Sequence, residues 1–162
     1  MSTIIDNLIT DRTQADVERV KALAAKGFAA MTAAERAEWL TGMKGAYNAS
    51  DMNRVGTALN YLAARLAPVC GMSIAWSAKT DWAVTDIITA SQAEAYRKQV
   101  QSIRGALAYP EGTPDAPELN RLTYTGANDI ERILALCEEL IDNITKAFRY
   151  TGASECATGG LI

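Results

Sequence analysis

Apolar residues along this chain recur at steps of three and four, the period of an amphipathic α-helix. The clearest run lies between residues 51 and 66, after the N-cap candidates Asn48 and Ser50. Its apolar positions are Met52, Val55, Leu59, Leu62 and Leu66. Alternating steps of this kind make a heptad-type seam, which indicates a helix packed nearly antiparallel to its neighbours. Pro68 is expected to block any continuation, because proline lacks the N–H that a helix interior needs.

Capping signals predict two helices before this one. Thr13 and Asp16 suit the start of a helix over residues 14–26, and Gly27 suits its end. Thr32 and Glu35 have the spacing of a capping box, in which each side chain satisfies the backbone N–H of the other residue. A second helix is therefore expected over residues 33–44.

Two further helices are predicted in the second half of the chain. Residues 91–108 repeat the seam, with Thr89 or Ser91 as the cap. Residues 126–149 form the longest candidate, after Thr125. Its apolar stripe is wide enough to contact more than one neighbour. The seam consists of Ile130, Leu134, Cys137, Ile141, Ile144 and Phe148, widened by Ile133, Leu136 and Leu140.

Two stretches interrupt the helical rhythm. Residues 67–89 include an alternating run, 72–76, which permits either a short β-hairpin or an irregular loop. Residues 110–117 hold three of the four prolines, which favours an extended linker. The prediction is an all-α fold: an up-and-down bundle of four to five helices over residues 1–150 with an excursion near 67–89. A flexible tail is expected over residues 151–162, because that stretch is rich in Gly, Ala, Ser and Thr.

Composition narrows the class of protein. With 162 residues of which 49% are hydrophobic, the chain can bury a core of its own. A net charge of −3 argues against a nucleic-acid binder, which normally needs a basic face. No apolar run reaches membrane-spanning length, and the N-terminus lacks a signal peptide, so a cytoplasmic origin without membrane association is expected. The three cysteines, Cys70, Cys137 and Cys156, are expected to be thiols.

Candidate chemistry is sparse, since the chain has no histidine and no phosphate-binding or nucleophile motif. No catalytic, cofactor-binding or metal site is predicted, and the protein is not expected to be an enzyme. The carboxylates of Glu138, Glu139 and Asp142 could serve acid/base or metal chemistry, but they are interpreted as a solvated helix face. Trp76 and Trp82 either cover one end of the bundle or form an aromatic contact patch.

Several segments together carry a resemblance to a known group of proteins. They are Asn7-Leu8-Ile9-Thr10-Asp11-Arg12-Thr13, Met31-Thr32-Ala33-Ala34-Glu35 through Trp39-Leu40, Lys44-Gly45-Ala46-Tyr47-Asn48, Asn53-Arg54-Val55-Gly56, Lys79-Thr80-Asp81-Trp82, Leu122-Thr123-Tyr124 and Ala127-Asn128-Asp129-Ile130-Glu131. The chain resembles, up to about residue 150, small proteins encoded beside tail and tail-fibre genes in phages and prophages of Gram-positive gut bacteria. The resemblance carries over no catalytic residue.

The resemblance implies a structural part of a virion, located in the tail, the baseplate or the fibre-attachment region. Its partners would be other virion proteins or further copies of the chain, met in the host cytoplasm during assembly. Trp76, Trp82 and the apolar tip Leu161-Ile162 are the candidate interface residues. The alternative is a small phage-encoded regulatory or adaptor module that binds another protein through a surface groove.

Overall fold

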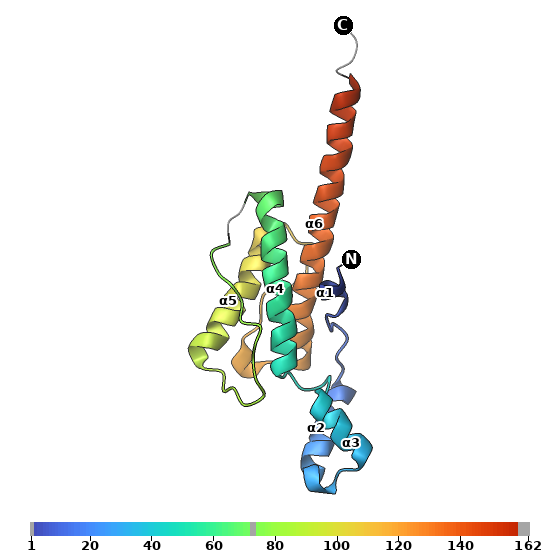
Figure 1. The fold of residues 1–162 in the computed structure, drawn as a ribbon, viewed down its shortest axis with the longest axis vertical. Helices are drawn as coiled ribbons and strands as arrows, with labels where there is room; N and C mark the ends of the chain where they lie inside the picture. Colours follow the sequence, from blue (N-terminus) through green and yellow to red (C-terminus); the bar gives the residue numbers. More distant parts are fainter. Residues whose placement is uncertain (1, 72–73, 159–162) are drawn as a thin grey trace.

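The computed structural model of the chain describes residues 2–71 and 74–158 (Figure 1). Within these ranges all regular structure is helical, which confirms the all-α prediction. The helices are α1 (Thr3–Asp6), α2 (Gln14–Lys26), η1 (Phe28–Ala30), α3 (Ala33–Thr41), α4 (Ala49–Cys70), α5 (Ala90–Ala106), η2 (Leu119–Arg121) and α6 (Tyr124–Thr158). None of the described helices is long and apolar enough to cross a membrane.

The predicted caps of the first two long segments are confirmed. Thr13 and Asp16 form a reciprocal capping box at the start of α2, and Thr32 and Glu35 form one at the start of α3. Helix α2 ends before Gly27, whose φ of 76° lies in the left-handed region that glycine adopts cheaply. Helix α3 stops at Thr41, earlier than predicted, because Gly42 follows with a φ of 90°.

Helices α4, α5 and α6 pack against one another and form the body of the molecule. Their shared core holds most of the predicted seam positions of all three helices, and α1 adds Ile5 to it. Phe148, predicted at the end of the α6 seam, is instead 68% exposed. The fully buried seam residues include Val55, Leu59, Leu62, Leu66, Val100, Ile103, Ile130, Leu134, Cys137 and Ile141. The hydrophobic periodicity therefore identified the core correctly.

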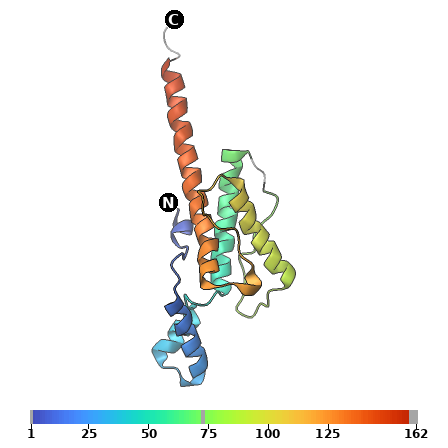
Figure 2. The same ribbon diagram turned by 180° about the vertical axis from the view of Figure 1, so that it is seen from behind.

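The predicted up-and-down arrangement is wrong, because α4 and α6 run parallel. Arg54 bonds to Glu131, Tyr61 to Glu138 and Arg65 to Asp142, and each pair is separated by 77 residues. A constant difference in residue number arises only between parallel helices. Figures 1 and 2 show that α5 runs the same way, with its first residues at the end of the body where α4 and α6 also begin.

The connecting segments make this parallel arrangement possible. A heptad seam fixes which face of a helix is buried, but it does not fix the direction of the neighbouring helix. Residues 71–89 and 107–123 each return the chain to the starting end of the body. The 22 residues of α4 rise about 1.5 Å each, whereas an extended residue advances about 3.3 Å. Either connecting segment is therefore long enough to run back along the whole length of α4.

The irregular alternative for the excursion near 67–89 is confirmed over residues 74–89, but the excursion begins later than predicted. Helix α4 continues through Pro68 to Cys70 and ends at Gly71, which adopts the left-handed conformation. Pro68 cannot donate a hydrogen bond to the carbonyl four residues before it, and the helix ends two residues later. The β-hairpin alternative is wrong for the part that the structure describes: residues 74–89 form an irregular segment, and residues 72–73 lie outside the description.

Two parts project from the body at opposite ends of the molecule (Figures 1 and 2). The first is the arm, residues 14–41, which comprises α2, η1 and α3. Leu23 and Met31 of the arm form a separate small core with Met43, which follows it. The second is the far end of α6. The offset of 77 places Cys70, the last residue of α4, level with Ala147. The remaining residues of α6, 148–158, form an overhang about 16 Å long.

The overhang alters the expected boundary of the C-terminal tail. The last helix was predicted to end at residue 149, but its backbone is helical to Thr158. Residues 159–162, which include Leu161 and Ile162, lie outside the described residues. The flexibility of the tail therefore stays a prediction.

Candidate functional site

A buried ionic cluster lies where the arm meets the body. It consists of Arg12, Asp51, Arg54 and Glu131, and is called the lower cluster below. Arg12 Nη2 lies 2.9 Å from Asp51 Oδ1 and 2.6 Å from Glu131 Oε1. Arg54 Nε donates to Glu131 Oε2 at 2.9 Å, and Arg54 Nη2 also contacts Asp51. The formal charges cancel, which is the condition for burying four ionised groups together.

The lower cluster fixes the N-terminal segment to α6. Glu131 Oε2 accepts a hydrogen bond from the backbone N–H of Ile9 at 2.6 Å, and Arg12 Nη1 donates to the Ile9 carbonyl at 2.7 Å. The Asn128 side-chain amide pairs with the Arg12 backbone, accepting from its N–H and donating to its carbonyl, both at 2.9 Å. Over residues 9–12 the chain entering the arm is therefore held by directional bonds, next to the apolar contacts of Ile5 and Leu8 with the core.

The chain leaving the arm is held at the same place. The Arg12 guanidinium lies 5.7 Å from the centre of the Tyr47 ring, and the Tyr47 and Tyr96 hydroxyls form a close hydrogen bond. Burial raises the pKa of both phenols, so this bond joins neutral hydroxyls at ordinary pH. At Gly45 an added Cβ would lie 2.1 Å from the Asp16 carbonyl oxygen. Both ends of the arm are thus packed together at its root.

The accessible part of the lower cluster is the Arg54 side chain, which is 17% exposed. Arg54 borders two shallow surface hollows, one beside Asn7 and Thr57 and the other beside Lys44 and Ser50. Lys44 is bonded to Asp11 at 2.8 Å, so the positive charges around these hollows already have anionic partners. In the part of the chain that the structure describes, no group of three His, Cys, Asp or Glu side chains could hold a metal ion.

A second ionic group, the upper cluster, lies further along the same two helices. Arg65 pairs with Asp142 at 2.8 Å and contacts Glu138, and the Tyr61 hydroxyl donates to Glu138 Oε1 at 3.0 Å. This corrects the interpretation of residues 138–142 as a solvated face. Glu139 is exposed as expected, but Glu138 is 1% exposed and faces α4. The interpretation failed because the partners, Tyr61 and Arg65, lie on a different helix.

The irregular segment that carries both tryptophans is attached to α4 by two asparagines. The Asn53 side chain bonds to the backbone N–H and carbonyl of Trp82 at 2.6 and 2.9 Å. The Asn60 side chain bonds in the same way to Ala78 at 2.7 and 2.9 Å. Between them, an added Cβ at Gly56 would lie 2.2 Å from the Lys79 carbonyl oxygen. Backbone thus packs directly on backbone at this point.

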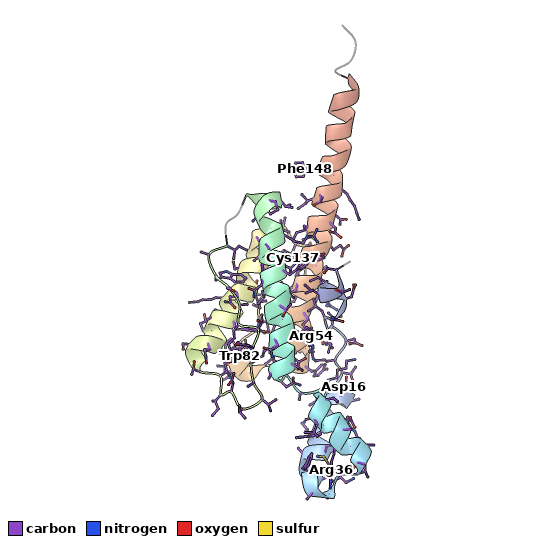
Figure 3. All side chains as sticks on the ribbon, in the orientation of Figure 1. Asp16, Arg36, Arg54, Trp82, Cys137 and Phe148 are labelled. Atoms are coloured by element: carbon purple, nitrogen blue, oxygen red, sulfur yellow. The ribbon has the colours of Figure 1, made fainter. Side chains whose placement is uncertain are left out.

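The two tryptophans lie mainly against the body. Trp82 is only 9% exposed, and the Lys79 ammonium lies 4.8 Å from the centre of its ring (Figure 3). Trp76 is partly buried against the main core. Their burial agrees with a packing role, but the segment that carries them is bonded along α4 and is not shown to cover one end of the bundle. A partner contact at Trp76 or Trp82 stays a prediction, as does one at Leu161 and Ile162.

The lower cluster was missed by sequence reasoning, although three of its four residues lie in the segments on which the proposed resemblance rests. Arg12, Arg54 and Glu131 come from three of those segments and the neighbouring Tyr47 from a fourth, and the structure brings them together. One signal was available: Glu131 and Glu138 are seven residues apart and adjoin the apolar seam of α6. Carboxylates repeated at that spacing beside a seam indicate buried partners on a neighbouring helix.

The large apolar side chains left uncovered lie partly on the two projecting ends. Leu40 on α3 is 73% exposed, and Phe148 at the start of the overhang is 68% exposed (Figure 3). Phe28 in the arm is half exposed and lies beside the Arg36 guanidinium. Val84 and Ile87 are also exposed, in the irregular segment before α5.

Comparison of the chain with protein-family models, with curated proteins and with solved structures finds no match.

Proposed function

We propose that this protein is a structural component of a phage virion, located in the tail, the baseplate or the fibre-attachment region. Its function is to join other proteins through its surfaces, without catalysis. The observation that carries the proposal is a firmly packed body with a helical projection at each end (Figure 1). The resemblance to proteins encoded beside tail genes supplies the virion context.

The geometry supports a joining role in two ways. The arm is held at its root by the buried lower cluster, so its position relative to the body is defined before any partner binds. The overhang of α6 extends beyond the end of α4, and its first apolar side chain, Phe148, is largely exposed. Exposed apolar side chains on projecting elements are typical of interaction sites.

The direct test is mass spectrometry of purified particles induced from a strain that carries the gene. The proposal expects peptides of this chain to co-purify with the tail proteins through a density gradient, at a constant ratio to them. A replication protein of the same phage serves as the control and should be depleted. Absence from the particles, together with recovery on a non-virion protein from induced cells, would replace the proposal by the regulatory or adaptor module.

A further inference from the structure

One face of α4 binds an extended segment of the same chain through main-chain atoms. Residues 74–82, called the strap below, lie along this face (Figure 1). Asn60 accepts from the N–H of Ala78 and donates to its carbonyl, and Asn53 does the same for Trp82. Such paired bonds to one residue are those that a neighbouring β-strand makes. Because all four bonds go to backbone groups, any peptide whose backbone takes the same path can form them.

The spacing of the two asparagines suits an extended chain. Asn53 and Asn60 are seven residues apart on α4, a distance of about 10.5 Å along the helix axis. The strap residues that they bind are four apart, which covers about 13 Å when extended but only about 6 Å when helical. Between the asparagines, an added Cβ at Gly56 would lie 2.2 Å from the Lys79 carbonyl oxygen. The site therefore receives an extended backbone laid directly on the helix.

Few side chains of the strap contribute to its recognition. Ala78 and Trp82 are buried, whereas Lys79, Thr80 and Asp81 between them are exposed. The Lys79 ammonium pairs with Asp81 at 2.9 Å, so these two charges satisfy each other within the strap. The site thus requires a small residue followed, four positions later, by a large aromatic one.

The strap is attached less completely than the helices of the body. Of its residues only Ala78 belongs to the buried part of the main core, and from α5 it receives a long bond, 3.4 Å, from Gln99 to the Ser77 carbonyl. The Trp82 indole N–H is buried with no hydrogen-bond acceptor among the described residues, which costs free energy. Release of the strap would leave the seams of α4, α5 and α6 in contact and return the two asparagines to water.

We propose that the face of α4 between Asn53 and Asn60 is a peptide-binding site, which the strap occupies until a segment of a partner protein displaces it. The partner segment is extended and carries a small residue with a large aromatic one four positions later. It forms the same four main-chain bonds and takes the places of Ala78 and Trp82. The inference goes beyond the proposed function, because it applies equally to a virion component and to an adaptor.

Amide hydrogen exchange of the wild-type protein tests whether the strap leaves α4 while the body stays folded. The N–H groups of Ala78 and Trp82 are bonded to α4 side chains, whereas Leu62 lies in the core of α4. After correction for intrinsic rates, we expect the two strap amides to exchange about 10- to 1,000-fold faster than that of Leu62. Equal rates would mean that the strap separates only on global unfolding and would overturn the proposal.

Peptide binding tests the site itself. The probe is a fluorescein-labelled synthetic peptide with the sequence of residues 74–82, and fluorescence anisotropy gives its Kd. In the full-length chain, Trp82→Ala weakens the strap but leaves α4 unchanged. This variant should bind the peptide at least about 10-fold more tightly than the wild type, in which the strap competes at high effective concentration. Val84→Ala, which changes an exposed residue just outside the strap, is the matched control and should bind like the wild type.

A second set of variants removes the site. Adding Asn53→Ala and Asn60→Ala to Trp82→Ala deletes the four main-chain bonds and should abolish binding, as should scrambling the peptide sequence. Binding that survives either change, or equal affinities of Trp82→Ala and the wild type, would overturn the proposal. Circular dichroism confirms that each variant is folded. The exchange measurement needs no variant, so it decides the matter if Trp82→Ala does not fold.

Discussion

The lower and upper clusters both pair arginine with carboxylates between α4 and α6. They differ in how deeply the charged side chains are buried and in how many elements they join. In both, an arginine of α4 faces a buried glutamate of α6. The lower cluster encloses Arg12 and Glu131 with exposures of 1% and 0%, and it binds the N-terminal segment as well as α4 and α6. In the upper cluster Arg65 is 27% and Asp142 36% exposed, and only the two helices are joined.

The difference separates two roles for buried charge. Ion pairs removed from water often contribute little net stability, because desolvation offsets their attraction. The many directional bonds of the lower cluster instead define one position for residues 9–12 and, through Tyr47 and Asn48, for the start of α4. The upper cluster, open at one edge, aligns α4 and α6 without positioning a third element.

The largest effect is expected from breaking the lower cluster. Glu131→Ala should leave Arg12 and Arg54 without their main anionic partner and lower the free energy of unfolding by about 3–5 kcal/mol. Urea unfolding followed by circular dichroism measures this. Glu139→Ala, an exposed carboxylate on the same helix, is the control and should change stability by less than about 0.5 kcal/mol. Equal losses in the two variants would show that the lower cluster does not hold the fold together.

The next largest effect concerns α4 between the two clusters. Gly56→Ala should push the Lys79 carbonyl away from α4 and lower the free energy of unfolding by about 1–3 kcal/mol. Gly105→Ala on α5 has open space around the new Cβ and should instead raise stability by about 0.5–1 kcal/mol. Chemical denaturation of both variants gives the comparison. If Gly56→Ala gained stability too, the close packing of residues 74–82 on α4 would be refuted.

A smaller effect is expected at the upper cluster. Arg65→Ala removes the partner of Glu138 and Asp142, but Asp142 is 36% exposed, and loss of the long Arg65 side chain lets water reach the buried Glu138. We expect a loss of about 1–2 kcal/mol, less than at Glu131 because exposure screens the pair. Arg132→Ala, an exposed arginine on α6, is the matched control. A loss equal to that of Glu131→Ala would remove the distinction between the two clusters.

The helices were largely predictable because their signals are local. Each capping residue, such as Thr13 or Thr32, and each heptad seam lies within the helix that it organises. Periodicity and caps therefore predicted helices α2 to α6 to within a few residues. The exceptions are the C-terminal ends of α3, α4 and α6. The direction of packing was not local. It depends on the length of residues 71–89 and 107–123, which the seams do not encode.

The candidate site was far less predictable. Glu131 lies 119 residues from Arg12, and Arg54 lies 77 residues from Glu131, so no local pattern pairs them. Charged residues on a helix were interpreted as solvated because an isolated helix offers no other environment. Glu138 shows the limit of that assumption: its burial follows from Tyr61 and Arg65 on α4, which only the fold brings near.

The smallest effect concerns the Lys26–Glu35 ion pair inside the arm, in which the Lys26 side chain is 38% and the Glu35 side chain 17% exposed. Lys26 Nζ lies 2.6 Å from Glu35 Oε2, and this bond, with the Thr32 backbone N–H, lowers the Glu35 pKa from 4.5 to about 2. Because the folded pKa is depressed, the contact contributes fully above pH 4.5 and is lost as the pH falls towards 2.

NMR titration of the Glu35 carboxyl group measures this pKa directly. Lys26→Ala should raise the midpoint, because Lys26 is the largest cause of the lowered Glu35 pKa. Lys21→Ala removes the exposed partner of Glu18 and should leave the Glu35 midpoint unchanged. A wild-type midpoint near 4.5 would mean that the Lys26 contact and the Thr32 cap are not maintained in solution. The arm would then be held at its root by the lower cluster while its two helices moved against each other.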